Sequence, residues 1–154
     1  MIIIGIDPGT AETGLGIIQT TPTGFKLVYH TCVKTKQIFS PEKRLQQIFT
    51  QVSQAISDHK PQLLSMESLF FATNAKSVMA VGQAMGAVML AAANHNIPVF
   101  KYSPPQIKRA VSGDGRAKKP QLQSAVRKHL KLKAIPRPQH AADALAAALC
   151  HLLK

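Results

Sequence analysis

Short apolar runs and stripes of apolar residues at helical spacing follow one another along the chain. Three apolar runs near the N-terminus predict strands at residues 2–6, 13–20 and 25–35. The turn formers Pro22, Thr23 and Gly24 predict a hairpin between the last two of these strands. Residues 40–42 have the types that begin a helix, and the apolar spacing after them predicts a helix that Pro61 ends. We expect a fourth strand at residues 62–66, followed by Glu67.

The second half of the chain predicts helices alternating with one further strand. A helix rich in Ala and Met is expected at about residues 74–94. Gly82 and Gly86 share one of its faces, and small residues at that spacing let another backbone approach closely. We therefore expect this helix to be buried or to contact a second subunit. The remaining expected elements are a strand at 97–102, a basic helical region broken by a loop at 112–115, and helices at about 119–130 and 139–153.

This order of elements favours an α/β fold with a mixed sheet, antiparallel at its start and parallel later. No repeat or linker divides the chain, so residues 1–154 are expected to form a single domain. No apolar stretch approaches the roughly 18 uninterrupted residues that a membrane span needs. The first residues have no basic lead-in and predict a strand, not a signal peptide. Cys32 and Cys150 form neither a zinc-type pair nor a disulfide scaffold, which favours the cytoplasm.

Charge narrows the range of functions. The chain has 19 Lys and Arg residues against 7 Asp and Glu, a net charge of +12. Residues 101–137 hold eleven of the basic residues and a single acid, Asp114, so this segment carries +10. An ordinary solvated helix face mixes both signs, whereas a face this one-sided indicates a polyanionic partner.

The few acids lie at positions that indicate a metal site. Asp7 ends the first strand and Glu67 follows the fourth, and the carboxyl ends of parallel strands meet at one edge of a sheet. Asp143 is the only formally charged residue from 138 to 153, and a lone carboxylate in an apolar helix is costly to bury without a cation or hydrogen bonds. His140 lies on the same face as Asp143. Each residue alone has a structural interpretation, as a turn former, a solvated strand end or a helix residue bonded to backbone. Together they could hold divalent cations such as Mg²⁺, and two such ions would clamp a phosphodiester.

Three blocks of the sequence resemble the RuvC family of Holliday-junction resolvases, in the family's order and over essentially the whole chain. They are Gly5-Ile6-Asp7-Pro8-Gly9-Thr10 with Thr13-Gly14-Leu15-Gly16, Glu67-Ser68-Leu69-Phe70-Phe71 continuing through Asn74-Ala75 to Gly82-Gln83-Ala84 and Gly86, and His140-Ala141-Ala142-Asp143-Ala144-Leu145-Ala146. The first block alone is weak, since sugar kinases and heat-shock ATPases have a similar turn.

The resemblance implies a ribonuclease-H-like α/β fold, a mixed five-stranded sheet with helices on both faces, and a homodimer. It implies cleavage that depends on Mg²⁺ or Mn²⁺, with two ions in each active site. By matching position, Asp7, Glu67 and Asp143 are metal-binding catalytic acids. His140 takes the fourth position of the site, where a role as metal ligand and a role as general acid or base both stay open. The DNA-binding residues implied by the match, or by their place in the basic segment, are Phe70, Lys108, Arg116, Lys118 and Lys119.

The reaction implied is the resolution of a four-way junction in recombination and repair. A dimer would nick two opposing strands and leave 5′-phosphate and 3′-hydroxyl ends. The branch-migration proteins RuvA and RuvB are partners implied by the same resemblance, and the bacterial cytoplasm is the expected location. Three other functions compete with this one: a DNA-binding module without catalysis, a nucleotide-binding kinase or ATPase of related fold, and a ribonuclease-H-like nuclease acting on RNA or hybrids.

Overall fold

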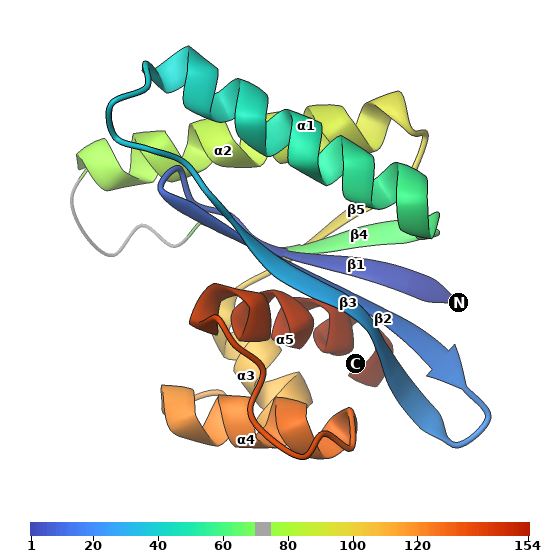
Figure 1. Ribbon diagram of the computed structural model, residues 1–154. Helices are drawn as coiled ribbons and strands as arrows, with labels where there is room; N and C mark the ends of the chain where they lie inside the picture. Colours follow the sequence, from blue (N-terminus) through green and yellow to red (C-terminus); the bar gives the residue numbers. More distant parts are fainter. Residues whose placement is uncertain (70–74) are drawn as a thin grey trace.

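The computed structural model describes residues 1–69 and 75–154, and in them a five-stranded sheet separates two groups of helices (Figure 1). One face of the sheet is covered by α1 (Pro41–His59) and α2 (Ala75–Asn94). The other face carries α3 (Pro104–Ser112), α4 (Lys119–His129) and α5 (Gln139–Leu153). Helices on both faces of the sheet are thus confirmed.

The sheet has the strand order β3-β2-β1-β4-β5. Its strands are β1 (Ile2–Asp7), β2 (Glu12–Thr21), β3 (Gly24–Lys34), β4 (Leu63–Glu67) and β5 (Val99–Tyr102). The pairs β1–β2 and β2–β3 are antiparallel, and the pairs β1–β4 and β4–β5 are parallel. The mixed sheet is therefore as predicted. The expected start of the last strand at residue 97 is wrong, because the Ile97 N–H still donates to the Ala92 carbonyl at the end of α2.

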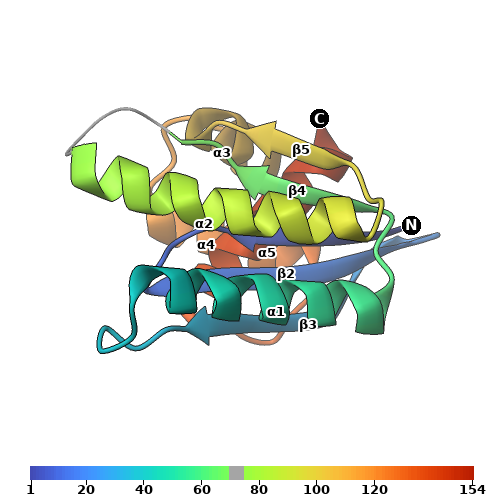
Figure 2. The ribbon, with the colours of Figure 1, turned by 90° about the horizontal axis from the view of Figure 1, so that it is seen from above.

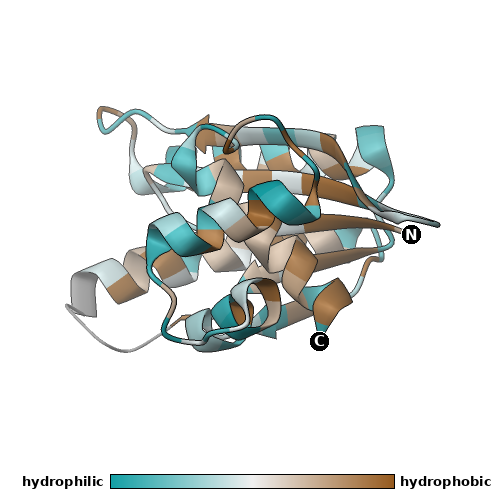
Figure 3. Ribbon diagram, turned by 90° about the horizontal axis from the view of Figure 1, so that it is seen from below, coloured by the Kyte–Doolittle hydropathy of each residue, from teal (hydrophilic) through white to brown (hydrophobic). Residues whose placement is uncertain are grey.

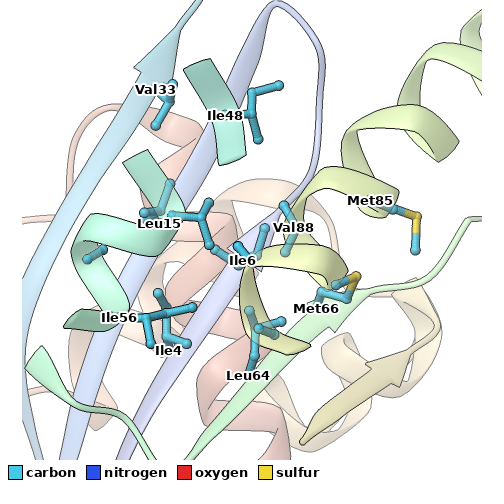
Figure 4. Close-up of a cluster of buried hydrophobic side chains, with 14 of the residues drawn as sticks. Ile4, Ile6, Leu15, Val33, Ile48, Ile56, Leu64, Met66, Met85 and Val88 are labelled. Carbon is cyan, nitrogen blue, oxygen red and sulfur yellow. The ribbon is translucent and has the colours of Figure 1, made fainter. Parts of the chain in front are cut away.

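Apolar side chains fill the space on both sides of the sheet. Under α1 and α2, Ile4 and Ile6 of β1 pack with Ile48 of α1 and Val88 of α2 (Figure 4). Ile3 points to the opposite face and packs among residues of α3, α4 and α5. Both faces of β1 are buried, which explains why the strand is an unbroken apolar run.

Helix α2 is a core helix with one uncovered face. It crosses the sheet beside α1, as the view from above shows (Figure 2). By length and composition residues Ser77–Asn94 could span a membrane, and 28% of this stretch is buried, including Ala84 and Val88 in the core. On its other side Met79 is 68% and Leu90 is 56% exposed.

Helix α5 lies directly on the sheet because the strands beneath it carry glycines. A Cβ on Gly5 of β1 would lie 1.9 Å from the Ala144 carbonyl oxygen, and a Cβ on Gly14 of β2 would lie 1.9 Å from that of His140. The buried Ser65 hydroxyl of β4 donates to the Ala147 carbonyl over 2.6 Å. Seen from below, α5 is a largely apolar helix between the sheet and the more polar α4 (Figure 3). These contacts fix the height and direction of the helix that carries His140 and Asp143.

Candidate metal centre

The register of the parallel strands brings two of the predicted acids together. Ile6 of β1 is the partner of Met66 in β4, so Asp7 and Glu67 are the next residues along their strands at the same edge of the sheet. A cavity of about 250 Å³ opens there, and its lining includes Asp7, Glu67 and Ser68. This arrangement is the one expected from the sequence for the carboxyl ends of parallel strands.

Helix α5 brings the other two predicted residues to the same place. The Nδ1 atom of His140 lies 2.7 Å from Oδ2 of Asp7, although the two residues are 133 positions apart. Asp143 follows one turn later on the same helix. Asp7, His140 and Asp143 each offer a ligand atom, and these atoms all lie within 4.8 Å of one another. Glu67 is not part of this trio but lines the same cavity as Asp7.

Burial and mutual repulsion disfavour the ionised forms of Asp7 and Glu67, as the shifts in their pKa values indicate. Burial raises the pKa of Asp7, and the nearby Asp143 raises it further, while the hydrogen bond from His140 opposes the shift. Burial, followed by the charges of Asp7 and Asp143, raises the pKa of Glu67 to about 7. Desolvated carboxylates in mutual repulsion are relieved by a cation. Carboxylate oxygens with one imidazole nitrogen form a donor set that suits Mg²⁺ and suits Mn²⁺ better.

Two of the lysines predicted to bind DNA lie in the field of the acids. The Lys119 ammonium at the start of α4 is 2.7 Å from Oδ2 of Asp143. The positive charges of Lys119 and, to a smaller extent, of Lys108 in α3 oppose the rise in the pKa of Glu67. Arg116 and Lys118 are exposed in the segment leading into α4. Phe70, predicted to contact bases, lies outside the described residues.

A residue that the sequence did not single out completes the surroundings of His140. Oε2 of Glu12 lies 3.0 Å from Nε2 of His140, and Oε1 of Glu12 lies 3.2 Å from the Lys34 ammonium. Glu12 is the first residue of β2 and pairs in register with Lys34 at the end of β3. One signal could have revealed it, because Glu12 is one of only 7 acids in the chain and follows Asp7 across a single tight turn.

The turn between β1 and β2 is held by buried hydroxyl groups. The Thr13 hydroxyl donates to the Gly9 carbonyl over 2.5 Å, and the Thr35 hydroxyl donates to the Thr10 carbonyl over 2.5 Å. Nε of Arg44 in α1 donates in turn to the Thr35 hydroxyl over 2.8 Å. The backbone that separates Asp7 from Glu12 is thus anchored from both ends.

Comparison with known proteins matches nearly the whole chain to one family. The family model described as crossover junction endodeoxyribonuclease RuvC matches residues 3–151. The crossover junction endodeoxyribonuclease RuvC of Natranaerobius thermophilus is 47% identical over 151 residues, which cover 98% of this chain and 94% of the relative. The structure of Thermus thermophilus RuvC aligns with a TM-score of 0.93 at 36% identity, covering 99% of this chain and 94% of the other. T. thermophilus RuvC in complex with a Holliday junction substrate aligns with a TM-score of 0.91 at 34% identity, with the same coverage.

Proposed function

The chain belongs to the RuvC family of crossover junction endodeoxyribonucleases, and from this membership we propose that it resolves Holliday junctions by nicking two opposing strands. The ribonuclease-H-like fold predicted from the sequence is confirmed by the aligned solved structures. The observation that carries the proposal is the meeting of Asp7, His140 and Asp143 at the edge of the sheet. We propose further that residues 1–154 act as one nuclease domain, in DNA recombination and repair in the bacterial cytoplasm.

In this proposal Asp7, Glu67, Asp143 and His140 hold two divalent cations, Mg²⁺ or Mn²⁺. The bound ions would lower the pKa of an attacking water, polarise the phosphodiester and stabilise the leaving oxygen, so that 5′-phosphate and 3′-hydroxyl ends result. Family membership and the carboxylate–imidazole cluster support metal dependence. The proposed number of two ions rests on family membership, with Glu67 lining the same cavity as Asp7 but lying outside the trio.

The protein's own residues hold the geometry and carry the DNA. The glycines under α5 keep His140 and Asp143 close to the strand that bears Asp7. The Lys119 ammonium offsets part of the negative charge beside Asp143, so that a phosphate approaches a less repulsive site. Lys108, Arg116 and Lys118 extend the positive surface along α3 and the start of α4, where we propose that they contact DNA strands together with Phe70.

We propose that two copies of the chain act on one junction, because a four-way junction has an approximate two-fold axis that a symmetric dimer matches. The uncovered face of α2 is the proposed contact. Apart from the neighbouring backbone of α2 itself, no atom of the described residues lies within 4 Å of a Cβ built on Gly86, and a Cβ on Gly82 would meet only the Leu69 side chain at 3.6 Å. Within the described chain no other backbone approaches these glycines closely, so we propose that a second subunit does. RuvA and RuvB remain proposed partners by family membership alone.

Cleavage of three substrates tests the proposed function. The purified protein with Mg²⁺ should nick a synthetic four-way junction in opposing strands and leave a linear duplex and an RNA–DNA hybrid intact. Asp7→Asn should lower the nicking rate by more than about a hundredfold, because even groups behind a metal ligand typically contribute 10–100-fold. The same variant should bind the junction as well as wild type does. Preferential cleavage of the hybrid would contradict the proposal, and loss of binding in Asp7→Asn would assign that residue a structural role.

A further inference from the structure

The imidazole of His140 is held between two carboxylates on opposite edges of the ring. Nδ1 faces Oδ2 of Asp7 at 2.7 Å, and Nε2 faces Oε2 of Glu12 at 3.0 Å. The ring edge that faces Asp7 belongs to the metal centre, because the ligand atoms of Asp7, His140 and Asp143 lie within 4.8 Å of one another. Glu12 is outside that trio and touches only the far edge of the ring.

The two ring nitrogens of a neutral imidazole have different roles, because one carries a proton and the other a lone pair. A histidine that binds metal through one nitrogen generally donates the N–H of the other to a carboxylate or carbonyl, and this fixes both the tautomer and the orientation of the ring. Glu12 is placed to accept such a bond from Nε2. With that proton committed to Glu12, Nδ1 would have a lone pair for a cation bound beside Asp7 and Asp143, in place of the hydrogen bond that it makes to Asp7 without an ion.

Glu12 is itself held in place by its neighbours in the sheet. It is the cross-strand partner of Lys34, and the Lys34 ammonium lies 3.2 Å from the carboxylate oxygen that His140 does not use. The two oxygens of Glu12 are therefore divided between Lys34 and His140. The ion pair also balances the charge of Glu12, so the carboxylate orients His140 without adding net negative charge beside the metal centre.

We propose that Glu12, anchored by Lys34, is a positioning residue that accepts the Nε2–H of His140 and presents Nδ1 as a metal-donor atom beside Asp7 and Asp143. The inference rests on the proposed metal-dependent cleavage and decides between the two roles left open for His140 in favour of ligand. Glu12 touches neither DNA nor metal in this scheme and acts only through the histidine.

Binding of Mn²⁺ in the absence of DNA, measured by the electron paramagnetic resonance signal of the free ion, tests the proposal without using activity. Glu12→Ala should weaken Mn²⁺ binding by about tenfold or more. Glu12→Gln should stay within about threefold of wild type, because the amide oxygen still accepts the Nε2–H. The matched control is Glu42→Ala, which removes an exposed carboxylate on α1 and should leave Mn²⁺ binding unchanged.

A double-mutant cycle separates action through His140 from direct action on the metal. His140→Ala should weaken Mn²⁺ binding, and adding Glu12→Ala to it should cause no further loss. The ¹⁵N spectrum of the Mg²⁺-loaded protein gives an independent signature, since wild type and Glu12→Gln should show a protonated Nε2 on His140. In Glu12→Ala that signal should broaden or disappear as the proton exchanges with water.

Several results would overturn the assignment of Glu12. Unchanged Mn²⁺ affinity in Glu12→Ala would do so, as would an equal loss in Glu12→Gln and Glu12→Ala, which would indicate charge and not a hydrogen bond. A further loss in the His140→Ala background would make Glu12 act directly on the metal. A wild-type protein that binds Mn²⁺ but cuts no junction would contradict the proposed function and leave the role of Glu12 standing, whereas one that binds no Mn²⁺ would overturn both.

Discussion

Replacing Gly14 by Ala should damage the metal centre through the backbone of α5. The added Cβ would lie 1.9 Å from the His140 carbonyl oxygen and 2.4 Å from its carbonyl carbon, whereas real contacts of this kind are at least 3.0 Å. The first turn of α5 must therefore retreat by about 1.1 Å, the difference between 1.9 and 3.0 Å. Because His140 and Asp143 move with that turn, both shift relative to Asp7.

The expected cost has two parts that separate experiments measure. Forced overpacking destabilises a protein by about 1–3 kcal/mol, which for a chain of this size lowers Tm by roughly 3–10 °C. A misplacement of about 1 Å among reacting groups reduces the rate by on the order of a hundredfold. Single-turnover nicking of a saturating four-way junction with Mg²⁺ should be measured well below Tm, so that the unfolded fraction contributes nothing.

Ile48→Val is the matched control, because it weakens the core between the sheet and the helices α1 and α2, on the face of the sheet away from α5. It should cost about 0.5–1.5 kcal/mol of stability and leave the nicking rate of the folded protein unchanged. If folded Gly14→Ala protein cut at the wild-type rate, the position of α5 would not determine the geometry of the active site. The same conclusion would follow if its loss of rate merely tracked its loss of stability.

Three further results are expected. Since the pKa of Glu67 is raised from 4.5 to about 7, mainly by burial, the metal-free folded protein binds more protons than the unfolded chain between these values. The contribution of Glu67 to the free energy of unfolding should thus be complete below pH 4.5 and disappear as the pH rises through about 7. Urea midpoints of wild type and Glu67→Gln, measured in a chelator, would reveal this change. Equal pH slopes in the two proteins would count against it. Junction binding should weaken steeply with salt, and Lys108→Ala or Arg116→Ala should each reduce the slope of log K against log[salt] by about 0.9, while a flat dependence would contradict the proposed interface. Leu90→Glu, which adds a charge to the uncovered face of α2, should yield monomers in sedimentation experiments, and an unchanged dimer would locate the contact elsewhere.

The sequence alone determined much of the fold and most of the site. Apolar runs such as that of β1, and apolar residues at helical spacing, predicted nearly every element. They could do so because buried residues recur at the spacing typical of each kind of element. Asp7 and Glu67 could be placed together from the sequence because parallel strands bring their carboxyl ends to one edge. Asp143 was conspicuous as a lone charge in an apolar helix.

The tertiary structure alone decided how these residues are combined. The sequence around Asp7 does not indicate that His140, 133 positions away, lies against it. The distance of α5 from the sheet is set by Gly5 and Gly14 beneath the helix. The same packing brings Lys119 to Asp143 and His140 to Glu12. Neither contact could be predicted from the sequence. The sequence carries the chemistry of each group, but the distances between groups far apart in the chain depend on close packing of backbone against backbone, and these distances make the four residues one centre.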